Sequence, residues 1–179
     1  MKARFHIAIR LLHWLMALAI FTMLFVGAGM VSSVANRDWL YDLHKPLGIA
    51  ILVLALLRLA VRLSTRTPPL PGDMPLFMQL VAKFSHLLLY GLMLAMPLVG
   101  WLMLSAGGYP VTLGGGIELP ALVAKSNSLY ALLRPLHSLL AYSLLLLVLG
   151  HMAAALFHGL IRRDAVLSSI GFGKSRPMD

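Results

Sequence analysis

Histidines are the residues of this sequence that offer the most chemistry, and five or six of the seven lie within or at the edges of long apolar stretches. The seven are His6, His13, His44, His86, His137, His151 and His158. An ionisable side chain in a bilayer is costly, so it usually faces the protein interior and serves a cofactor, an ion or a proton path. Cysteine is absent, which excludes disulfides, thiolate-held iron–sulfur clusters and covalent haem attachment. Any redox cofactor must therefore be held non-covalently.

The spacing of the histidines indicates two sites. His137 and His151 are 14 residues apart, which is close to four helical turns, so they share one helix face. At about 1.5 Å per residue they are about 21 Å apart along the axis, one near each membrane surface. In an alternating bundle His44 is level with His137, and His13 with His151. Facing imidazole pairs without nearby thiols or carboxylates suit axial ligation of haem iron, so the spacing predicts two bis-histidine b-type haems.

At the inner level the spacing leaves a choice, because His13, His86 and His151 reach similar depths. His137 and His151 lie on one stripe of the last apolar stretch, that is, on one helix face. This favours His13 as the partner of His151, with His86 as a pocket residue. His158 continues that stripe seven residues further. Two interpretations stay open for it: an interfacial amphipathic role, and a quinone or proton-transfer role. His6 is expected to lie in a solvated terminus.

The same 14-residue step from the other histidines reaches Gly27, Gly100 and Arg58. A glycine lets a flat porphyrin approach the backbone closely, although small residues also serve ordinary helix packing in membranes. An inward-facing arginine needs an anionic partner, which a haem propionate would supply. The alternative for Arg58 is a side chain that extends to the cytoplasmic surface.

The elements that must position these residues are membrane-spanning helices. Of 179 residues 60% are hydrophobic and 12% are charged, far from the composition of a soluble domain. Four apolar runs are long enough to cross a bilayer, at about residues 7–31, 39–63, 81–106 and 129–161. The first run is too long for a secretory signal core, and three more follow it. We expect one all-α domain over 1–179, an integral membrane four-helix bundle with up-down-up-down order.

Basic residues predict the orientation, because short loops rich in Lys and Arg stay in the cytoplasm. With both termini inside, eleven of the fifteen basic residues are cytoplasmic. The four outside are Arg37, Lys45, Lys125 and Arg134. The formal charge of +9 is then explained mostly by topology, and nucleic acid is not an expected partner.

Two alternatives to haem binding are transport of another metal and a bundle without a cofactor. Zinc or copper transport usually recruits carboxylates or thiols, whereas the acidic residues here lie in predicted loops, a tail or the first turn of the second span. A haem-free transporter or structural bundle is the other alternative, and it predicts a colourless protein.

Several segments together resemble the prokaryotic cytochrome b561 family. They are RLLHW at 10–14, LHKPLG at 43–48 with Arg58 downstream, HLLLY at 86–90 with PLVGW at 97–101, PLH at 135–137, HMAAALFH at 151–158 and RRD at 162–164. The resemblance covers nearly the whole chain. Its most specific element is the histidine pair of the last span together with the histidines of the first two spans.

The resemblance implies a di-haem b-type cytochrome of the bacterial inner membrane. It implies that His13 and His151 hold one haem, and that His44 and His137 hold the other. The family is similar to quinone-linked electron carriers, and one branch resembles a superoxide oxidase that passes electrons from periplasmic superoxide to ubiquinone. Related four-helix cytochromes are membrane subunits of hydrogenases and formate dehydrogenases, so a haem-bearing subunit of such a complex is the second hypothesis.

The primary hypothesis is one-electron transfer across the bilayer, from an outer donor such as superoxide or a redox protein to a quinone. His158 and His86 are candidate proton donors to the quinone. Lys45 and Arg134, beside the outer histidines, either attract an anionic donor or pair with haem propionates. Four basic and three acidic outer residues (Asp38, Asp42 and Glu118) leave a charge of only +1, so strong steering is not expected.

Overall fold

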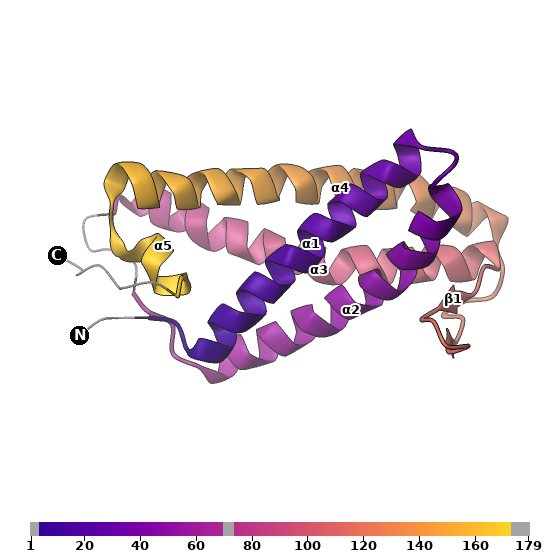
Figure 1. Ribbon diagram of the computed structural model, residues 1–179, viewed down its shortest axis with the longest axis horizontal. Coiled ribbons are helices and arrows are strands. Elements are labelled where there is room, and N and C mark those ends of the chain that lie inside the picture. The colour runs from indigo at the N-terminus through magenta and orange to yellow at the C-terminus, as the bar shows by residue number, and fades with distance from the viewer. Residues whose placement is uncertain (1–3, 70–73, 173–179) are drawn as a thin grey trace.

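Four long helices dominate the computed structural model, which describes residues 4–69 and 74–172 (Figure 1). They are α1 (Ile7–Ser32), α2 (Arg37–Ser64), α3 (Leu76–Gly107) and α4 (Asn127–Leu156). All four are long and apolar enough to cross a membrane, with α4 counted together with the π-helical segment η1 (Phe157–Arg162) that continues it. The predicted all-α membrane bundle is confirmed. The largest difference is at the start of α3, which lies at Leu76 rather than near 81.

Two small features complete the described chain. Strands β1 (Val111–Thr112) and β2 (Glu118–Leu119) pair antiparallel within the connection between α3 and α4. A short helix, α5 (Ala165–Ile170), follows η1. Neither feature has a counterpart among the four apolar runs identified in the sequence.

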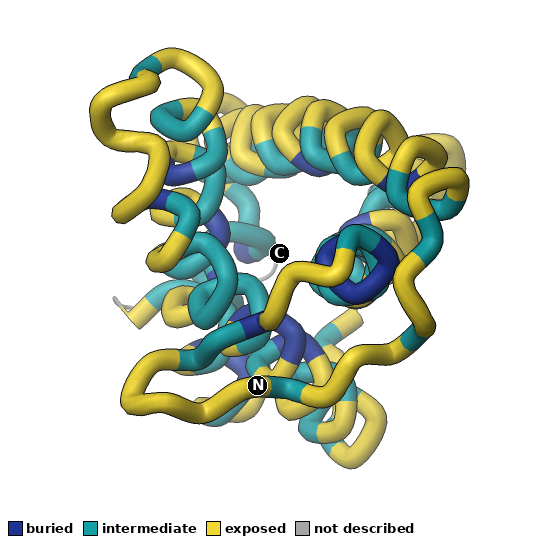
Figure 2. The backbone as a smooth tube through the Cα atoms, turned by 90° about the vertical axis from the view of Figure 1, so that its right-hand side faces the viewer, coloured by how far each residue is buried: buried dark blue, intermediate teal, exposed yellow. Residues whose placement is uncertain are grey.

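Consecutive helices pack against each other in the order α1–α2, α2–α3 and α3–α4, which gives the predicted alternation of direction. The first and last described segments meet at one end, where the Phe5 amide donates a hydrogen bond to the Ser169 carbonyl at 3.3 Å. Exposed residues follow the outer sides of the helices (Figure 2), and many are large and apolar, as expected of a lipid-facing surface. Which end is cytoplasmic, and whether 1–179 is one domain, stay predictions.

The buried core lies at the middle of the bundle and takes residues from all four helices. Ile20, Ile51, Met93 and Leu144 belong to this cluster. Each stands midway along one of the 14-residue steps that begin or end at a histidine, seven residues from either end. The core is therefore an apolar layer between the two histidine levels, and we call these four residues the midplane layer.

The packing around α4 is uneven. Its extensive helix interface is with α3, and within 4–69 and 74–172 neither α1 nor α2 shares a comparable interface with it. The midplane cluster contains Leu144 of α4 together with residues of α1, α2 and α3. The histidine pairs described below also join α4 to α1 and α2.

Candidate functional site

The outer histidine pair joins α2 to α4. The ring centroids of His44 and His137 are 6.2 Å apart, and their planes are inclined by 66°. Both Nδ1 atoms are buried and have no hydrogen-bond partner among the described residues. A buried imidazole nitrogen without a partner is costly, so this pair has an unmet need for a ligand.

The inner pair joins α1 to α4 with nearly the same geometry. The centroids of His13 and His151 are again 6.2 Å apart, with the ring planes at 84°. The Nδ1 atom of His13 is also buried without a partner in the described part of the chain. His86 lies closer to His151, at 5.3 Å between centroids, and its Nδ1 donates a 2.6 Å hydrogen bond to the Ala82 carbonyl.

The residues fit a metal held between two imidazoles. An imidazole nitrogen lies about 1.1 Å from its ring centroid and binds a metal at about 2.0 Å, so two rings on opposite sides of one metal have centroids about 6.2 Å apart. The pairs His44–His137 and His13–His151 both have this separation. The separation of His86 and His151 is shorter than such a metal requires. Within 4–69 and 74–172, no group of three or more His, Cys, Asp or Glu residues is placed to hold a metal ion.

The two predicted glycines differ in their surroundings. A Cβ atom added at Gly100 would lie 3.2 Å from Cε1 of His137, so this glycine lets α3 come close to the outer pair. A Cβ atom added at Gly27 would meet nothing within 4 Å. Gly27 is therefore next to open space at the outer level, where the 14-residue step places it.

Arg58 stands at the inner level, as predicted. Its guanidinium lies 5.6 Å from the centroid of the Tyr90 ring and interacts electrostatically with His13, His86 and His151. Its Nε atom is buried without a hydrogen-bond partner, and the described residues give it no acidic partner. A cation in this position suits an anionic group bound from outside the chain.

Lys45 and Arg134 differ in how much of their charge is available. The Lys45 ammonium forms a 2.9 Å ion pair with Asp42 and lies 4.7 Å from the centroid of the Tyr41 ring. Only 8% of the Lys45 side chain is exposed, whereas Arg134 is an exposed residue. Sequence reasoning placed Asp42 in the outer charge count but did not identify it as the partner of Lys45.

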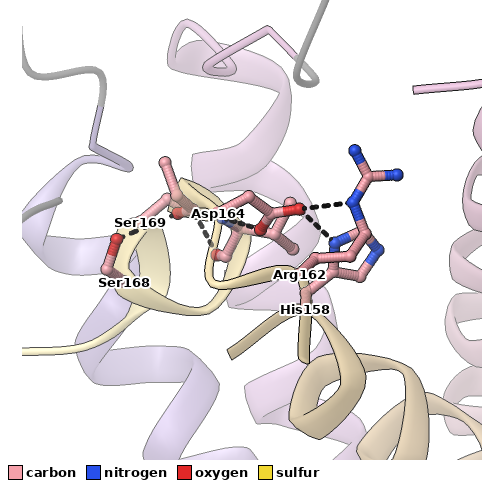
Figure 3. Close-up of polar contacts among 7 residues, drawn as sticks. His158, Arg162, Asp164, Ser168 and Ser169 are labelled. Carbon is pink, nitrogen blue, oxygen red and sulfur yellow. Dashed lines mark hydrogen bonds and ion pairs between the residues drawn. The ribbon is translucent and has the colours of Figure 1, made fainter. Parts of the chain in front are cut away.

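His158 lies in η1 and is held by an acidic residue that sequence reasoning did not single out. Its Nδ1 donates a 2.5 Å hydrogen bond to Oδ2 of Asp164, and Nε of Arg162 is 3.4 Å from the same oxygen (Figure 3). Asp164 entered the sequence analysis only within the RRD segment at 162–164, and its place before a short apolar segment is typical of a helix cap. His6 is exposed and accepts a 3.3 Å hydrogen bond from the Ala8 amide at the start of α1.

Comparison with known proteins identifies the family. The family model for prokaryotic cytochrome b561 matches residues 4–173. The chain belongs to the prokaryotic cytochrome b561 family. Membership implies haem b as the cofactor, and membrane electron transfer as the general function.

Individual relatives agree with this assignment. The cytochrome is 32% identical to cytochrome b561 homolog 2 of Escherichia coli (strain K12), over 91% of this chain and 88% of the relative. It is 31% identical to a probable superoxide oxidase, CybB, of Yersinia pestis, over 73% of this chain and 74% of the relative. It is also 27% identical to cytochrome b561 homolog 1 of the same E. coli strain, over 87% of this chain and 90% of the relative.

Proposed function

We propose that this cytochrome transfers electrons across the membrane by means of two haem b groups. His44 and His137 hold the outer haem, and His13 and His151 hold the inner one. The observation that carries the proposal is the 6.2 Å centroid separation found in both pairs, which is the separation that one metal between two imidazoles requires. The unpartnered Nδ1 atoms and the single stripe of α4 that bears both levels support it.

Haem iron supplies one-electron transfer, because it alternates between two oxidation states. The chain fixes the two sites about 21 Å apart along α4 and separates them with the midplane layer. Arg58 is the partner for a haem propionate at the inner level. Gly100 and Gly27 make room for the flat macrocycle at the outer level.

The proposed direction is from an anionic donor outside the membrane to a quinone near the cytoplasmic end. The name of the Yersinia pestis relative, a probable superoxide oxidase, favours superoxide as the donor. Ubiquinone is the acceptor that the family resemblance implies. Because Asp42 compensates the charge of Lys45, exposed Arg134 is the better candidate for attracting superoxide. The excess of basic residues at the inner end supports a bacterial inner membrane protein with both termini in the cytoplasm.

At the inner end the quinone needs protons as well as electrons. We assign proton donation to His158, which stands seven residues beyond His151 on the same stripe and keeps 13% of its side chain exposed. His86 packs against His151 and lines the pocket of the inner haem.

The test is a visible spectrum of the purified protein, with haem quantified per chain. We expect two b-type haems per chain, reduction of both by superoxide, and reoxidation by an added ubiquinone analogue. A colourless protein would favour the haem-free transporter. A haem-bearing protein that ignores superoxide but co-purifies with a dehydrogenase or hydrogenase would favour the membrane-subunit alternative.

A further inference from the structure

We infer that Asp164 is a positioning residue for quinone reduction, one that orients His158 to donate a proton from Nε2. This inference rests on the proposed function, because it concerns how that quinone site obtains its proton. Asp164 does not contact the quinone itself. It acts through the imidazole of His158.

The hydrogen bond decides which nitrogen of His158 is available. A carboxylate only accepts hydrogen bonds, so Nδ1 of His158 carries the proton in the 2.5 Å contact with Asp164. Nε2 is then the atom left to exchange a proton with another molecule. The side chains of His158 and Asp164 are 13% and 15% exposed, so both are largely buried but still accessible to water.

The backbone holds Asp164 in place from several sides. The Asp164 amide donates a 3.2 Å hydrogen bond to the His158 carbonyl, and the intervening Arg163 adopts the left-handed conformation with φ 55°. Oδ1 of Asp164 accepts a 3.0 Å hydrogen bond from the Val166 amide and so caps α5. One oxygen therefore fixes the short helix, and the other orients the imidazole.

Helix α5 is in turn attached to α1 beside the inner histidine pair. Nη2 of Arg10 donates a 2.5 Å hydrogen bond to the Gly171 carbonyl, and Nε1 of Trp14 donates one of 3.2 Å to the Ile170 carbonyl. Trp14 is adjacent to His13 in the sequence, and their rings are in contact. These contacts place the His158–Asp164 pair at the same end of the bundle as the inner site (Figure 1).

The described part of the chain places two charged side chains beside the imidazole, Asp164 and Arg162. Besides Asp164, the charged side chain beside it is Arg162, whose Nε lies 3.4 Å from the shared oxygen Oδ2 of Asp164. Helix α5 presents no ionisable side chain, and the hydroxyls of Ser168 and Ser169 donate to backbone carbonyls of their own helix. From α4, the nearest histidine on the stripe is His151, about two turns away. Asp164 is thus the acidic residue that contacts His158.

The proposed proton transfer is balanced as follows. A quinone takes two electrons from the one-electron donor and two protons to become the quinol. The Nε2–H bond of charged His158 breaks as an O–H bond forms on one quinone oxygen, which leaves a neutral imidazole with Nδ1–H still bonded to Asp164. The imidazole regains a proton from water, and the second quinone oxygen also takes its proton from water.

The experiment compares Asp164→Asn with Ser168→Ala and His158→Ala in the haem-loaded protein. Asn remains a good helix cap, so Asp164→Asn removes the charge while keeping α5 capped. The measurement is the rate at which a ubiquinone analogue reoxidises superoxide-reduced protein, recorded as a function of quinone concentration. Ser168→Ala alters α5 without touching His158 and is the matched control.

We expect His158→Ala to slow quinone reduction about a hundredfold, as loss of a general acid does. Asp164→Asn should slow it about tenfold, as is usual when the partner of a functional histidine is removed. The quinone KM and the rate of haem reduction by superoxide should not change. In a His158→Ala background, Asp164→Asn should add no further loss.

A wild-type rate of quinone reduction in Asp164→Asn would overturn the inference, as would an equal loss in Ser168→Ala. A loss in Asp164→Asn that is fully additive to that of His158→Ala would also overturn it. If the wild-type protein itself is not reoxidised by the quinone, the proposed function fails first, and the wild-type measurement shows this before any variant is made.

Discussion

Replacing His137 by glycine should remove the outer haem and leave the inner one. α4 contributes His137 to the outer pair, and the centroid of its ring lies 6.2 Å from that of His44. Without that ring, the proposed outer iron loses one of its two ligands and its link to α4. The inner pair, His13 with His151, uses a different part of the same helix.

The size of the effect follows from the spacing of the two levels. His137 and His151 are separated by 14 residues, about 21 Å of helix, and by the midplane layer. A local change at one level should therefore leave the other level unaltered. We expect the haem content to fall from two per chain to one, with about half of the b-type absorbance lost.

The assay combines haem content by pyridine haemochromogen with helix content by circular dichroism. Free imidazole gives a matched control, since it fits the space left by the missing ring of His137→Gly and should restore the second haem in the same variant. His6→Ala, at an exposed position, should keep both haems. Retention of two haems in His137→Gly would refute the ligand assignment, and so would loss of both from a chain with wild-type helix content.

Three further predictions test the surroundings of the sites. Gly100→Ala places a methyl group 3.2 Å from the His137 ring and should lower outer-haem occupancy. Gly91→Ala, on the same helix, has open space and should keep wild-type occupancy. Equal haem content in the two variants would contradict this. Arg58→Leu removes a partly buried cation that favours the reduced haem. Potentiometric titration should find the inner-haem potential lowered by about 60 mV, a tenfold shift for one electron, and an unchanged potential would count against a role beside the haem. The orientation can be tested with single cysteines, because the chain has none of its own. In intact spheroplasts an impermeant maleimide should label Ile117→Cys but not Thr67→Cys. The opposite result would reverse the predicted orientation.

The helices and the histidine pairs could be predicted from the sequence because both follow from one periodicity. Apolar runs of bilayer length specify the helices. A 14-residue step returns to nearly the same helix face, so it predicts that His137 and His151 look in one direction. The choice between His13 and His86 could not be made from the spacing alone. It depends on lateral distances between helices, which the spacing of residues along one helix does not determine.

The arrangement at the C-terminal end could not be predicted for a different physical reason. It is built from the π-helical segment Phe157–Arg162, the left-handed residue Arg163 and hydrogen bonds from α1 to carbonyls some 160 residues away. None of these has a periodic signature in the sequence. The hairpin between α3 and α4 is similar, since strands of two residues leave no alternating pattern. Only Gly114–Gly116, all with positive φ, marked the turn.

The midplane layer places buried apolar side chains between the two histidine sites. Seven residues are close to two helical turns, so the residue halfway between His137 and His151 points in nearly the same direction as both, and it is Leu144. The same holds for Ile20, Ile51 and Met93 on the other helices, and all four meet in one buried cluster. An apolar, close-packed layer offers no hydrogen-bonding chain for protons, whereas one-electron transfer between cofactors needs no such chain. Under the proposed function, electrons therefore cross the bundle while the protons for quinone reduction enter from the end where His158 lies.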